Sequence, residues 1–406
     1  MENLRREEEI VAAADEEIER TRKGEAHVRA LDITGRPLAG AEVKAELVRH
    51  AFLFGGNIYM FDRFEADEEN ALYKQRFAEL FSYATVGFYW RWYEPERGHP
   101  SYPYTDKVVQ WCAEHKIRMK GHPLLWDCDA GVPTWSSGQP APEVQKQRVA
   151  DIIGRYGRQI AYWEVVNEPA HLGGIAISEP YRWARQADPG AYLIVNDYYV
   201  LADGYPPFFS LLQKAKADGV PFDGIGIQAH EPRTMRFPLG MVRSVLDRYA
   251  ALGKDLHITE FTPASSGQPI TGSPVTGLWD EDAQADYAVE FYRACFAHPA
   301  VAAITWWDLS DQGSWLPGGG LLRRDLSPKP VYRALHELTH GEWRTCVSGR
   351  TDSRGRFGFR GFFGDYAVTV TSQGRADRRE FRLDRTPVGG TGPDWIVRVA
   401  DYPTPP

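Results

Sequence analysis

Cysteine is scarce in this chain of 406 residues, which contains only four cysteines. They stand at positions 112, 128, 295 and 346, without the paired spacings of zinc ligands or of a disulfide framework. The histidines show no metal-like grouping either. We therefore expect no metal, no cofactor and no disulfide scaffold.

The chain also lacks a long hydrophobic run. Its first nine residues, MENLRREEE, are mostly charged, so no signal peptide is visible, and no segment is long enough to span a membrane. The sequence as written predicts a cytoplasmic protein, or a secreted one if a signal peptide has been removed.

Neither sign of charge dominates: 47 basic and 55 acidic side chains give a net charge of -8. This balance argues against nucleic acid and membranes as partners. Aromatic residues, by contrast, make up 13% of the chain, with 13 Trp and 20 Tyr. Sugar rings stack on such side chains, although ordinary core packing uses them as well.

The order of apolar and amphipathic segments divides the chain into five parts. Residues 1–24 are charged and favour a helix, residues 25–50 and 340–400 contain strand-like segments, and residues 401–406 form a Pro-rich, loose tail. Between them, residues 51–339 alternate apolar strands with amphipathic helices. The eight expected strands are residues 52–58, 84–90, 119–126, 161–167, 192–197, 224–230, 256–261 and 302–309.

Eight strand–helix units in about 290 residues are typical of a (β/α)8 TIM barrel. The alternative, an open doubly wound sheet, would show a Gly-rich phosphate turn after an early strand, and the sequence has none there. We therefore expect an α/β fold whose functional residues lie at the carboxyl ends of the barrel strands.

The segments at the two ends resemble the two halves of one small domain. Residues 32–43 (DITGRPLAGAEV) and 351–370 (TDSRGRFGFRGFFGDYAVTV) resemble halves of the transthyretin-like sandwiches called carboxypeptidase-regulatory-like domains. The early strand pair, residues 27–31 with 41–47, would be marginal by itself. We predict one accessory β-sandwich formed from the N- and C-terminal segments; two unrelated sheets are the alternative.

Two glutamates end two of the expected strands. Glu168 follows the apolar run in WEVVNEP, residues 163–169, and Glu260 ends HITE, residues 257–260. A pair of carboxyl groups at strand ends suits a glycosidase, in which one acts as acid/base and the other as nucleophile. Alternatively, such carboxylates merely cap neighbouring helices.

Six motifs stand at the ends of expected strands. They are residues 121–126 (GHPLLW), 163–168 (WEVVNE), 195–198 (VNDY), 224–230 (GIGIQAH), 258–260 (ITE) and 305–315 (TWWDLSDQGSW). Any one of them is weak, but all six, in this order, resemble the motifs of glycoside hydrolase family 10, whose usual activity is that of an endo-1,4-β-xylanase. The resemblance covers about residues 50–338 and implies a retaining enzyme that acts on a β-linked polysaccharide or oligosaccharide.

The resemblance also implies a role for each matching residue. Glu168 would be the acid/base and Glu260 the nucleophile, while Asn167 would bind the sugar 2-hydroxyl. Gln228 and His230 would steer Glu260 and keep it ionised, whereas Glu168 would need a raised pKa. The other sugar-binding residues would be His122, Trp126, Trp307 and Trp315.

The resemblance fails beside the expected catalytic pair. After the second strand the family shows Glu-Asn and then Lys-Trp, which grip the −2 xylose; here Val86 replaces the Asn and Tyr89 the Lys. After the third strand the family's His-Ser-Gln becomes Asp127, Cys128 and Asp129. Losing two polar contacts to a buried sugar costs on the order of a few kcal/mol. We therefore expect a rebuilt −2 subsite, in which Tyr89, Asp127 and Asp129 make other contacts.

These observations predict a retaining glycoside hydrolase that is xylanase-like but poor on plain xylan. An ordinary endo-1,4-β-xylanase with a −2 site built from other residues is one alternative. A non-catalytic carbohydrate-binding barrel is another, and release of a phenol from an aryl β-glycoside would exclude it.

Overall fold

The structure is a computed structural model that describes residues 2–385 and 392–399. Its contacts divide the chain into two compact units. The first consists of Met1–Ala12 and Leu53–His336, and the second of Ala13–Phe52 and Glu337–Pro406. The expected loose tail, residues 401–406, lies outside the described residues.

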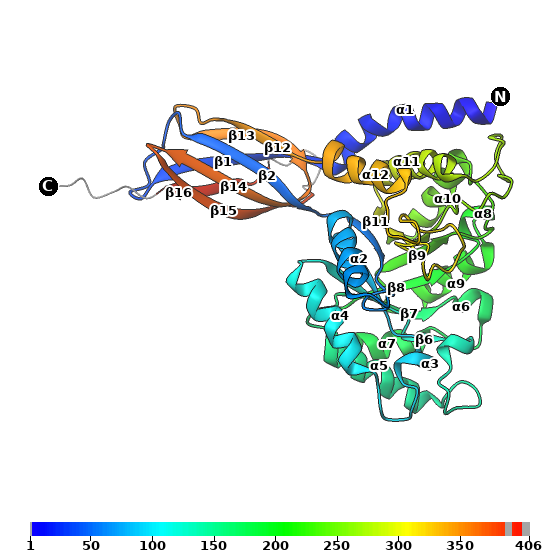
Figure 1. Ribbon diagram of the computed structural model, residues 1–406. Helices are drawn as coiled ribbons and strands as arrows, with labels where there is room; N and C mark the ends of the chain where they lie inside the picture. The colour runs from blue at the N-terminus through cyan, green and yellow to red at the C-terminus, as the bar shows by residue number, and fades with distance from the viewer. Residues whose placement is uncertain (1, 386–391, 400–406) are drawn as a thin grey trace. The chain divides into compact units, whose positions relative to one another are not determined.

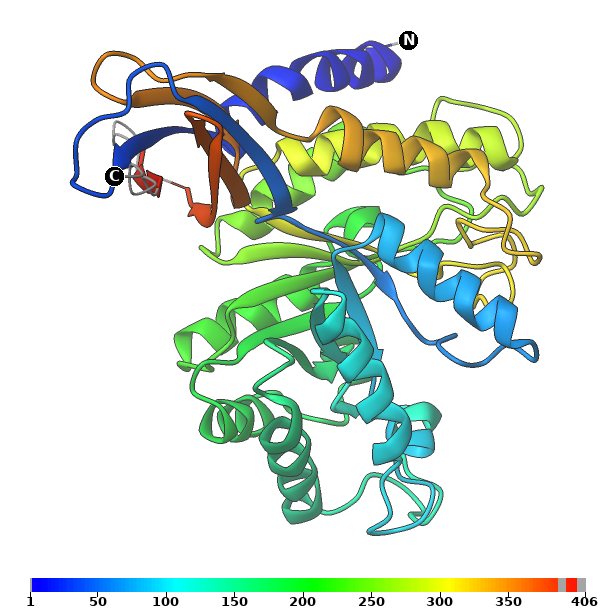
Figure 2. The ribbon, with the colours of Figure 1, turned by 60° about the vertical axis from the view of Figure 1, so that its left-hand side comes forward.

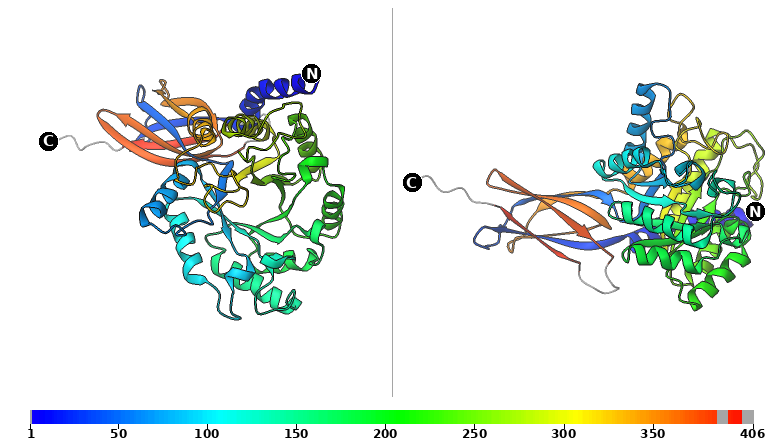
Figure 3. Two further views of the ribbon diagram at one scale, coloured as in Figure 1. Left: turned by 45° about the vertical axis from the view of Figure 1, so that its right-hand side comes forward. Right: turned by 90° about the horizontal axis from the view of Figure 1, so that it is seen from below.

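The first unit is a closed barrel of parallel strands (Figure 3, left). The strands follow one another around the ring in sequence order, and β3 pairs with β11 while β5 and β6 both pair with β7. The predicted (β/α)8 barrel is confirmed. Its strands are β3 (Leu53–Asn57), β4 (Tyr83–Gly87), β5 (Arg118–His122), β6 (Leu125–Trp126), β7 (Tyr162–Asn167), β8 (Tyr192–Asp197), β9 (Gly224–Ala229), β10 (Asp255–Phe261) and β11 (Val301–Trp306).

Several barrel strands are shorter than the sequence pattern suggested, among them β4 and the third strand. Strand β4 stops at Gly87, and Trp90–Tyr93 form the short helix α3 instead of continuing it. The third barrel strand is split into β5 and β6 at Pro123, which has no N–H to give to the ladder. Leu124 donates its N–H to the carbonyl of Glu164 (3.1 Å). Both breaks lie at the carboxyl end of a strand, where functional side chains are expected.

Helices surround the strands and bury apolar residues against them (Figure 1). Helix α5, for example, buries Val149, Ile152 and Ile153. None of the helices in residues 2–385 is long and apolar enough to cross a membrane. The longer helices of this unit are α2 (Asp67–Leu80), α4 (Tyr102–Glu114), α5 (Pro142–Tyr156), α7 (Ser178–Ala187), α9 (Pro206–Ala217), α10 (Leu239–Ala250), α11 (Glu281–Ala297) and α12 (Pro330–His336). The short turns are α3, α6 (Pro169–Leu172), α8 (Val200–Asp203) and η1 (Asp129–Gly131).

The amino-terminal helix α1 (Glu2–Arg22) has residues in both units. Within the first unit, Glu7 is buried and forms an ion pair of 2.7 Å with Arg236. The other carboxylate oxygen of Glu7 accepts the N–H of Leu239, the first residue of α10 (3.3 Å). Glu7 thus fixes the start of α1 to the barrel.

The second unit contains two facing sheets built from both ends of the chain (Figures 1 and 2). One has the order β13-β1-β16 and the other the order β12-β2-β14-β15. Tyr366 and Phe381 of the second sheet contact Trp395 of the first, with ring centroids 5.4 and 5.1 Å apart. The predicted accessory sandwich from both termini is confirmed, whereas its type stays a prediction. The π-helical turn η2 (Glu337–Glu342) precedes β12 in the chain. The strands of this unit are β1 (Lys23–Asp32), β2 (Glu42–His50), β12 (Cys346–Arg350), β13 (Arg356–Phe362), β14 (Gly364–Ser372), β15 (Arg375–Leu383) and β16 (Asp394–Val399).

The expected pairing of the first two strands with each other is wrong. Strand β1 pairs with β13 and β16, whereas β2 pairs with β12 and β14, as in Val43 opposite Val370. Asp32 ends β1 by accepting the N–H of Arg36 (2.8 Å), and residues 33–41 then lead to the other sheet. A tight hairpin would keep both strands in one sheet, and this connection is too long for one.

Candidate active site

Glu168 and Glu260 stand at the ends of two barrel strands and line one cavity of about 730 Å³. Glu168 directly follows β7, and Glu260 lies in β10 beside an irregularity of the ladder. The backbone of Glu168 is left-handed (φ 54°, ψ 44°), which is uncommon for a residue other than glycine. Strain of this kind persists where the surrounding structure fixes it, and it clusters at active sites. The structure therefore brings the two predicted carboxyl groups together.

Two side-chain donors hold the carboxyl group of Glu168. The indole Nε1 of Trp126 donates to Oε2 and the amide Nε2 of Gln228 donates to Oε1, both across 2.9 Å. Burial raises the pKa of Glu168 to about 7, although both hydrogen bonds favour the charged form, and the nearby carboxylate of Asp197 adds to the rise. A carboxyl group with a pKa near neutrality can give up a proton and take it back.

Glu260 is buried, and its carboxyl group meets an amide and an imidazole. Asn196 donates its Nδ2 to Oε1 (3.2 Å), and Nε2 of His230 lies 3.4 Å from Oε2. Burial raises the pKa of Glu260, and the charges of Glu164 and Glu168 raise it further. Glu168 and Glu260 therefore form a pair that favours one negative charge over two.

Asn196, which the structure buries completely, connects Glu260 with Asn167. Its Nδ2 also donates to Oδ1 of Asn167 (2.8 Å), and the hydroxyl of Thr259 donates to Oδ1 of Asn196. These bonds fix the orientation of the Asn196 amide. They also occupy the oxygen of Asn167, so Nδ2 is the donor that this cavity-lining residue offers.

The position of Gln228 differs from the expected one. Its amide donates to Glu168 instead of steering Glu260, and its Oε1 lies 3.1 Å from Nε2 of His230. Burial lowers the pKa of His230 to about 3, so its neutral ring has one N–H to donate. Nδ1 of this ring has no partner among the described residues, which favours the proton on Nε2. A chain of contacts thus runs from Glu260 through His230 and Gln228 to Glu168.

His122 lines the cavity and is anchored from behind by charged residues. Its Nδ1 hydrogen-bonds Glu164, which also accepts Nζ of Lys120 (2.5 Å), and all three side chains are buried. Burial opposes a charge on Glu164, but Lys120 and His122 lower its pKa to about 2. The ionised Glu164 therefore fixes the ring of His122, whose other nitrogen takes no part in this network.

Among the described residues, one group has the spacing of a metal site. His122, Glu164 and Glu260 place ligand atoms within 4.8 Å of one another. The ammonium group of Lys120 lies 2.5 Å from Glu164 and supplies a positive charge at the place where a cation would bind. The group therefore fits a hydrogen-bonded network better than a metal site.

Aromatic side chains form much of the cavity wall. The rings of Trp307 and Trp315 approach that of His230, with centroids 6.4 and 4.6 Å away. Tyr89 stands edge-on to His122 at 5.6 Å. All four aromatic residues expected to bind sugar, Tyr89, Trp126, Trp307 and Trp315, line this cavity. Such a wall offers ring faces on which sugars can stack.

Asp127 and Asp129, which were expected to contact sugar, are not part of this wall. The carboxylate of Asp127 lies against Gly174, where a side chain would collide with it. Asp129 is exposed and begins the turn η1, and its carbonyl accepts an N–H of Arg91 (3.3 Å). Of the irregular segment that follows Trp126, Ala130 lines the cavity, whereas Asp127 and Asp129 do not.

The wall also includes residues to which the sequence analysis assigned no sugar-binding role. Asp308 accepts hydrogen bonds from the amide of Asn57 (3.1 Å) and the N–H of Trp315 (2.9 Å), and burial raises its pKa to about 6. Only the position of Asp308 directly after Trp307 indicates in the sequence that it belongs to the site. The others are Tyr59, Trp92, Ala130, Tyr198, Tyr199, Glu231 and Gly313. Aromatic residues in loops follow no periodic pattern, so the sequence does not separate them from core residues.

The sequence profile described as glycosyl hydrolase family 10 matches residues 45–338. Anti-sigma-I factor RsgI6 of Acetivibrio thermocellus is 26% identical over 374 residues, and endo-1,4-beta-xylanase 2 of Arabidopsis thaliana is 28% identical over 379 residues. Each alignment covers 89% of this chain but only 47% and 33% of those proteins, so the chain spans less than half of their length. Endo-1,4-beta-xylanase B of Thermotoga neapolitana is 28% identical over 288 residues, which are 64% of this chain and 80% of the relative.

Solved structures agree with the profile. Xylanase 10B from Thermotoga petrophila RKU-1, in complex with xylobiose, has a TM-score of 0.60 at 26% identity over 72% of this chain and 95% of that one. Native xylanase 10B from Thermotoga maritima gives the same score and identity, over 72% of this chain and 96% of that one. The profile spans well over half of the chain, and its bounds enclose the whole barrel with both glutamates. The chain belongs to glycosyl hydrolase family 10.

Proposed function

We propose that the chain is a retaining glycoside hydrolase that cleaves a β-linked glycan with Glu168 and Glu260. The observation that carries this proposal is that both carboxyl groups line one aromatic-walled cavity, in which burial raises the pKa of Glu168 to about 7. Membership of family 10 supports it, and so do the xylanases among the relatives.

In the first step, ionised Glu260 attacks the anomeric carbon while Glu168 gives its proton to the leaving oxygen. The hydrogen bond from Asn196 favours the charged form of Glu260. The Nδ2 of Asn167 donates to the sugar 2-hydroxyl, a contact that strengthens in the oxocarbenium-like transition state. The products are a covalent glycosyl-enzyme and a sugar that leaves with the proton of Glu168.

In the second step, Glu168 takes a proton from a water molecule, which attacks the anomeric carbon and releases Glu260. Once Glu260 carries the sugar it is uncharged, so it no longer opposes a charge on Glu168. The donors Trp126 and Gln228 then stabilise the carboxylate form of Glu168. Two displacements at one carbon retain the β-configuration.

We further propose that the −2 subsite differs from that of a plain xylanase. Where the family offers Asn and Lys after the second strand, this chain has Val86, which is buried, and Tyr89, whose ring packs against those of His122 and Trp126. Neither side chain supplies the polar contacts of the residues that it replaces. We therefore expect weak activity on unsubstituted xylan.

The experiment is a product analysis of the purified chain on a panel of β-glycans and on unsubstituted xylohexaose. Proton NMR during hydrolysis should show the β-anomer first, as retention requires. Turnover of xylohexaose at the rates normal for the family would contradict the altered −2 subsite but not the hydrolase function. Complete inactivity on all β-glycans and on aryl β-glycosides would contradict the hydrolase itself.

An ordinary endo-1,4-β-xylanase is the second candidate. The xylanases among the relatives favour it. Under this hypothesis, Tyr89 and the additional wall residue Trp92 would replace the missing contacts to xylose. The same panel separates the two candidates, because only the ordinary xylanase cleaves xylohexaose and decorated glycans equally well.

A further inference from the structure

A second cavity, of about 290 Å³, adjoins the catalytic one. Tyr59, Tyr89 and Trp92 line both cavities, so these three side chains form a wall that the two cavities share. Residues 58–63 after β3, the end of β4 and the start of helix α4 complete the second cavity. Val86 and Tyr89, at which the chain departs from the family pattern, both belong to its wall.

The inner wall of this second cavity is apolar. Ile58, Val86 and Val108 are buried and line it, and Gly87 contributes no side chain. A cavity of about 150 Å³ lined by apolar side chains holds a benzene ring. The available 290 Å³ therefore accommodates one aromatic ring with a short linker. Tyr59 and Tyr89 meet edge-on at 5.6 Å, so an aromatic ligand would find both ring faces and ring edges.

Some polar groups of this wall are engaged with the protein itself, whereas the buried hydroxyls of Tyr59 and Tyr93 have no hydrogen-bond partner among the described residues. The hydroxyl of Tyr104 donates to the carbonyl of Phe61 (2.9 Å), and that of Thr105 donates to the carbonyl of Ser101 (3.3 Å). A sugar ring has several hydroxyls, and two phenol groups among apolar side chains would satisfy only part of them. An aromatic ring has no such requirement.

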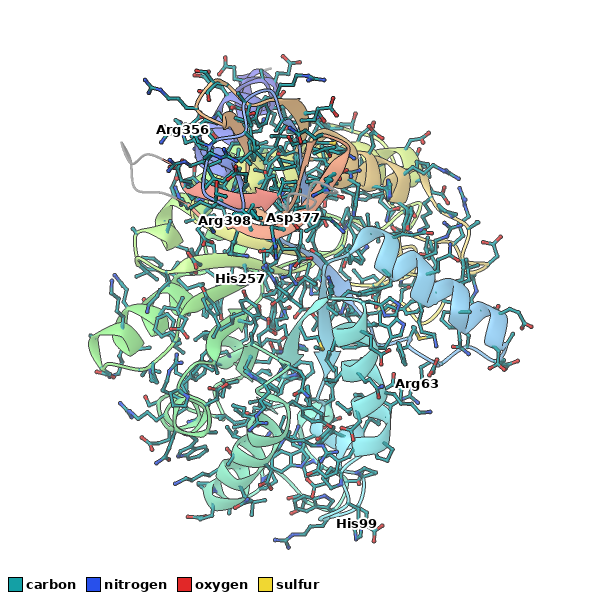
Figure 4. All side chains as sticks on the ribbon, turned by 90° about the vertical axis from the view of Figure 1, so that its left-hand side faces the viewer. Arg63, His99, His257, Arg356, Asp377 and Arg398 are labelled. Carbon is teal, nitrogen blue, oxygen red and sulfur yellow. The ribbon has the colours of Figure 1, made fainter. Side chains whose placement is uncertain are left out.

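Arg63 is the one charged residue among those that line this cavity. Its guanidinium lies over the ring of Tyr104, 4.2 Å from the centroid, and the side chain is exposed (Figure 4). It can donate hydrogen bonds at the outer edge of the cavity to an ester carbonyl or to a phenolic oxygen. A largely apolar wall with a guanidinium at its edge and few free hydroxyls matches an aromatic ring that carries only one or two polar groups.

We propose that the second cavity is a subsite for an aromatic acyl group, of the hydroxycinnamoyl ester type, carried by a sugar of the glycan in the catalytic cavity. This inference rests on the proposed hydrolase function and specifies its substrate class. The replacement of the family's Asn by Val86 and of its Lys by Tyr89 removes polar contacts and adds apolar surface in the same place. The preferred substrate is therefore an aryl-esterified glycan.

The first test compares one xylo-oligosaccharide in two forms, with its hydroxycinnamoyl ester and after saponification. The wild-type chain should hydrolyse the ester form with a kcat/KM at least tenfold higher. Ser101→Phe narrows the second cavity without removing a capping hydrogen bond, because the side chain of Ser101 makes none. It should abolish the preference and leave the rate on the saponified form unchanged. Lys107→Phe adds the same ring to an exposed position of α4 outside the cavity and should behave as wild type.

The proposal would be overturned if the wild-type chain hydrolysed the esterified and the saponified oligosaccharide at equal rates. It would also be overturned if Ser101→Phe lost the same factor of kcat/KM on both. A stronger preference for an oligosaccharide with a uronic acid branch would also overturn it, because Arg63 would then be binding a carboxylate. Cleavage of the saponified form with no ester preference refutes the subsite and leaves the hydrolase intact.

A second test does not depend on hydrolysis. Methyl ferulate should quench the tryptophan fluorescence of the wild-type chain and of Lys107→Phe, since Trp92 lines the cavity. Ser101→Phe and Val108→Phe, each checked for an unchanged melting temperature, should weaken binding at least tenfold. Absence of binding by the wild-type chain at millimolar ligand would refute the subsite even if no glycan were cleaved.

Discussion

The side-chain amide of Gln228 donates a hydrogen bond of 2.9 Å to Oε1 of Glu168. The residue therefore acts on the carboxyl group after β7, two strands away from its own in the ring, although its own neighbour β10 bears Glu260. His230 contacts both Glu260 and Gln228, so the amide orientation depends on the histidine. The protonation of Glu168 is consequently adjusted by Gln228 of β9 and by His230, which directly follows this strand.

Gln228→Leu should shift the alkaline limb of the pH profile of kcat/KM to higher pH. The hydrogen bond from Gln228 favours ionised Glu168, so its loss raises the pKa of Glu168 above about 7 and keeps the acid protonated longer. The second step, which needs the carboxylate, should slow at neutral pH. Profiles of kcat/KM and of kcat with an aryl β-glycoside measure the two effects. An unmoved alkaline limb would show that Gln228 does not tune the acid.

Glu168→Gln and Glu260→Gln should both reduce glycan hydrolysis, but they should respond differently to the leaving group. A general acid contributes about 10²–10⁴-fold, and a dinitrophenolate leaving group does not need it. Glu168→Gln should therefore still show a burst of dinitrophenol from a dinitrophenyl β-glycoside, and azide should rescue its turnover. Glu260→Gln should show neither effect. The opposite pattern would exchange the two roles, and full activity of either variant would remove that residue from the mechanism.

Glu168 should lower the free energy of unfolding as pH rises. The pKa of Glu168 is about 7 in the fold against an ordinary 4.5, so the folded state binds the proton more tightly than the unfolded chain does. The destabilisation by ionised Glu168 is absent below pH 4.5 and lowers the free energy of unfolding by about 3 kcal/mol above pH 7. Glu168→Gln should thus raise the melting temperature at pH 8 and change little at pH 4. Glu179→Gln, at an exposed position, is the control and should not change the melting temperature. If Glu168→Gln raised the melting temperature equally at pH 4 and pH 8, the ionisation of Glu168 would not be the cause.

The sequence predicted the fold and the carboxyl pair because both depend on local patterns. Buried residues such as Val165 and Val166 precede Asn167 in a strand, and turn residues separate the strands, so the strand ends are visible without coordinates. In a parallel barrel all strand ends of one kind meet at one rim. The position of Glu168 next to Glu260 therefore followed from strand counting.

The contacts between side chains could not be predicted from the sequence, because they depend on the direction in which each side chain points at the rim. Gln228 donates to Glu168 with its amide nitrogen while its amide oxygen meets His230, an orientation that no sequence pattern specifies. Asp127 and Asp129 lie in an irregular segment, for which no periodicity fixes the facing. One contact is visible in the sequence. Lys120 is a charged residue inside an apolar strand and therefore indicates a buried partner of opposite charge, which is Glu164.

Glu164→Gln should strongly destabilise the barrel. Lys120 and Glu164 are both buried, and removal of one charge leaves the other without compensation, at a cost of about 3–5 kcal/mol. The double variant Lys120→Met with Glu164→Leu should recover most of this loss in urea denaturation. The folded pKa of Glu164 is about 2, below the ordinary 4.5, so its stabilisation is present above pH 4.5 and is lost as pH falls towards 2. Equal stability of Glu164→Gln and wild type at pH 7 would exclude a charged pair.

Glu7→Ala should release the start of α1 from the barrel. Arg236 is buried between Glu7 and Glu290, and the loss of Glu7 also leaves the N–H of Leu239 without its acceptor. Breaking a buried pair costs about 3–5 kcal/mol, and because Glu290 still compensates Arg236 we expect the lower end of this range. Limited proteolysis should then cut α1 faster, and the urea midpoint should fall. Glu8→Ala, at an exposed position of the same helix, should change neither, so equal effects of the two variants would indicate a general loss of helix propensity instead of a lost ion pair.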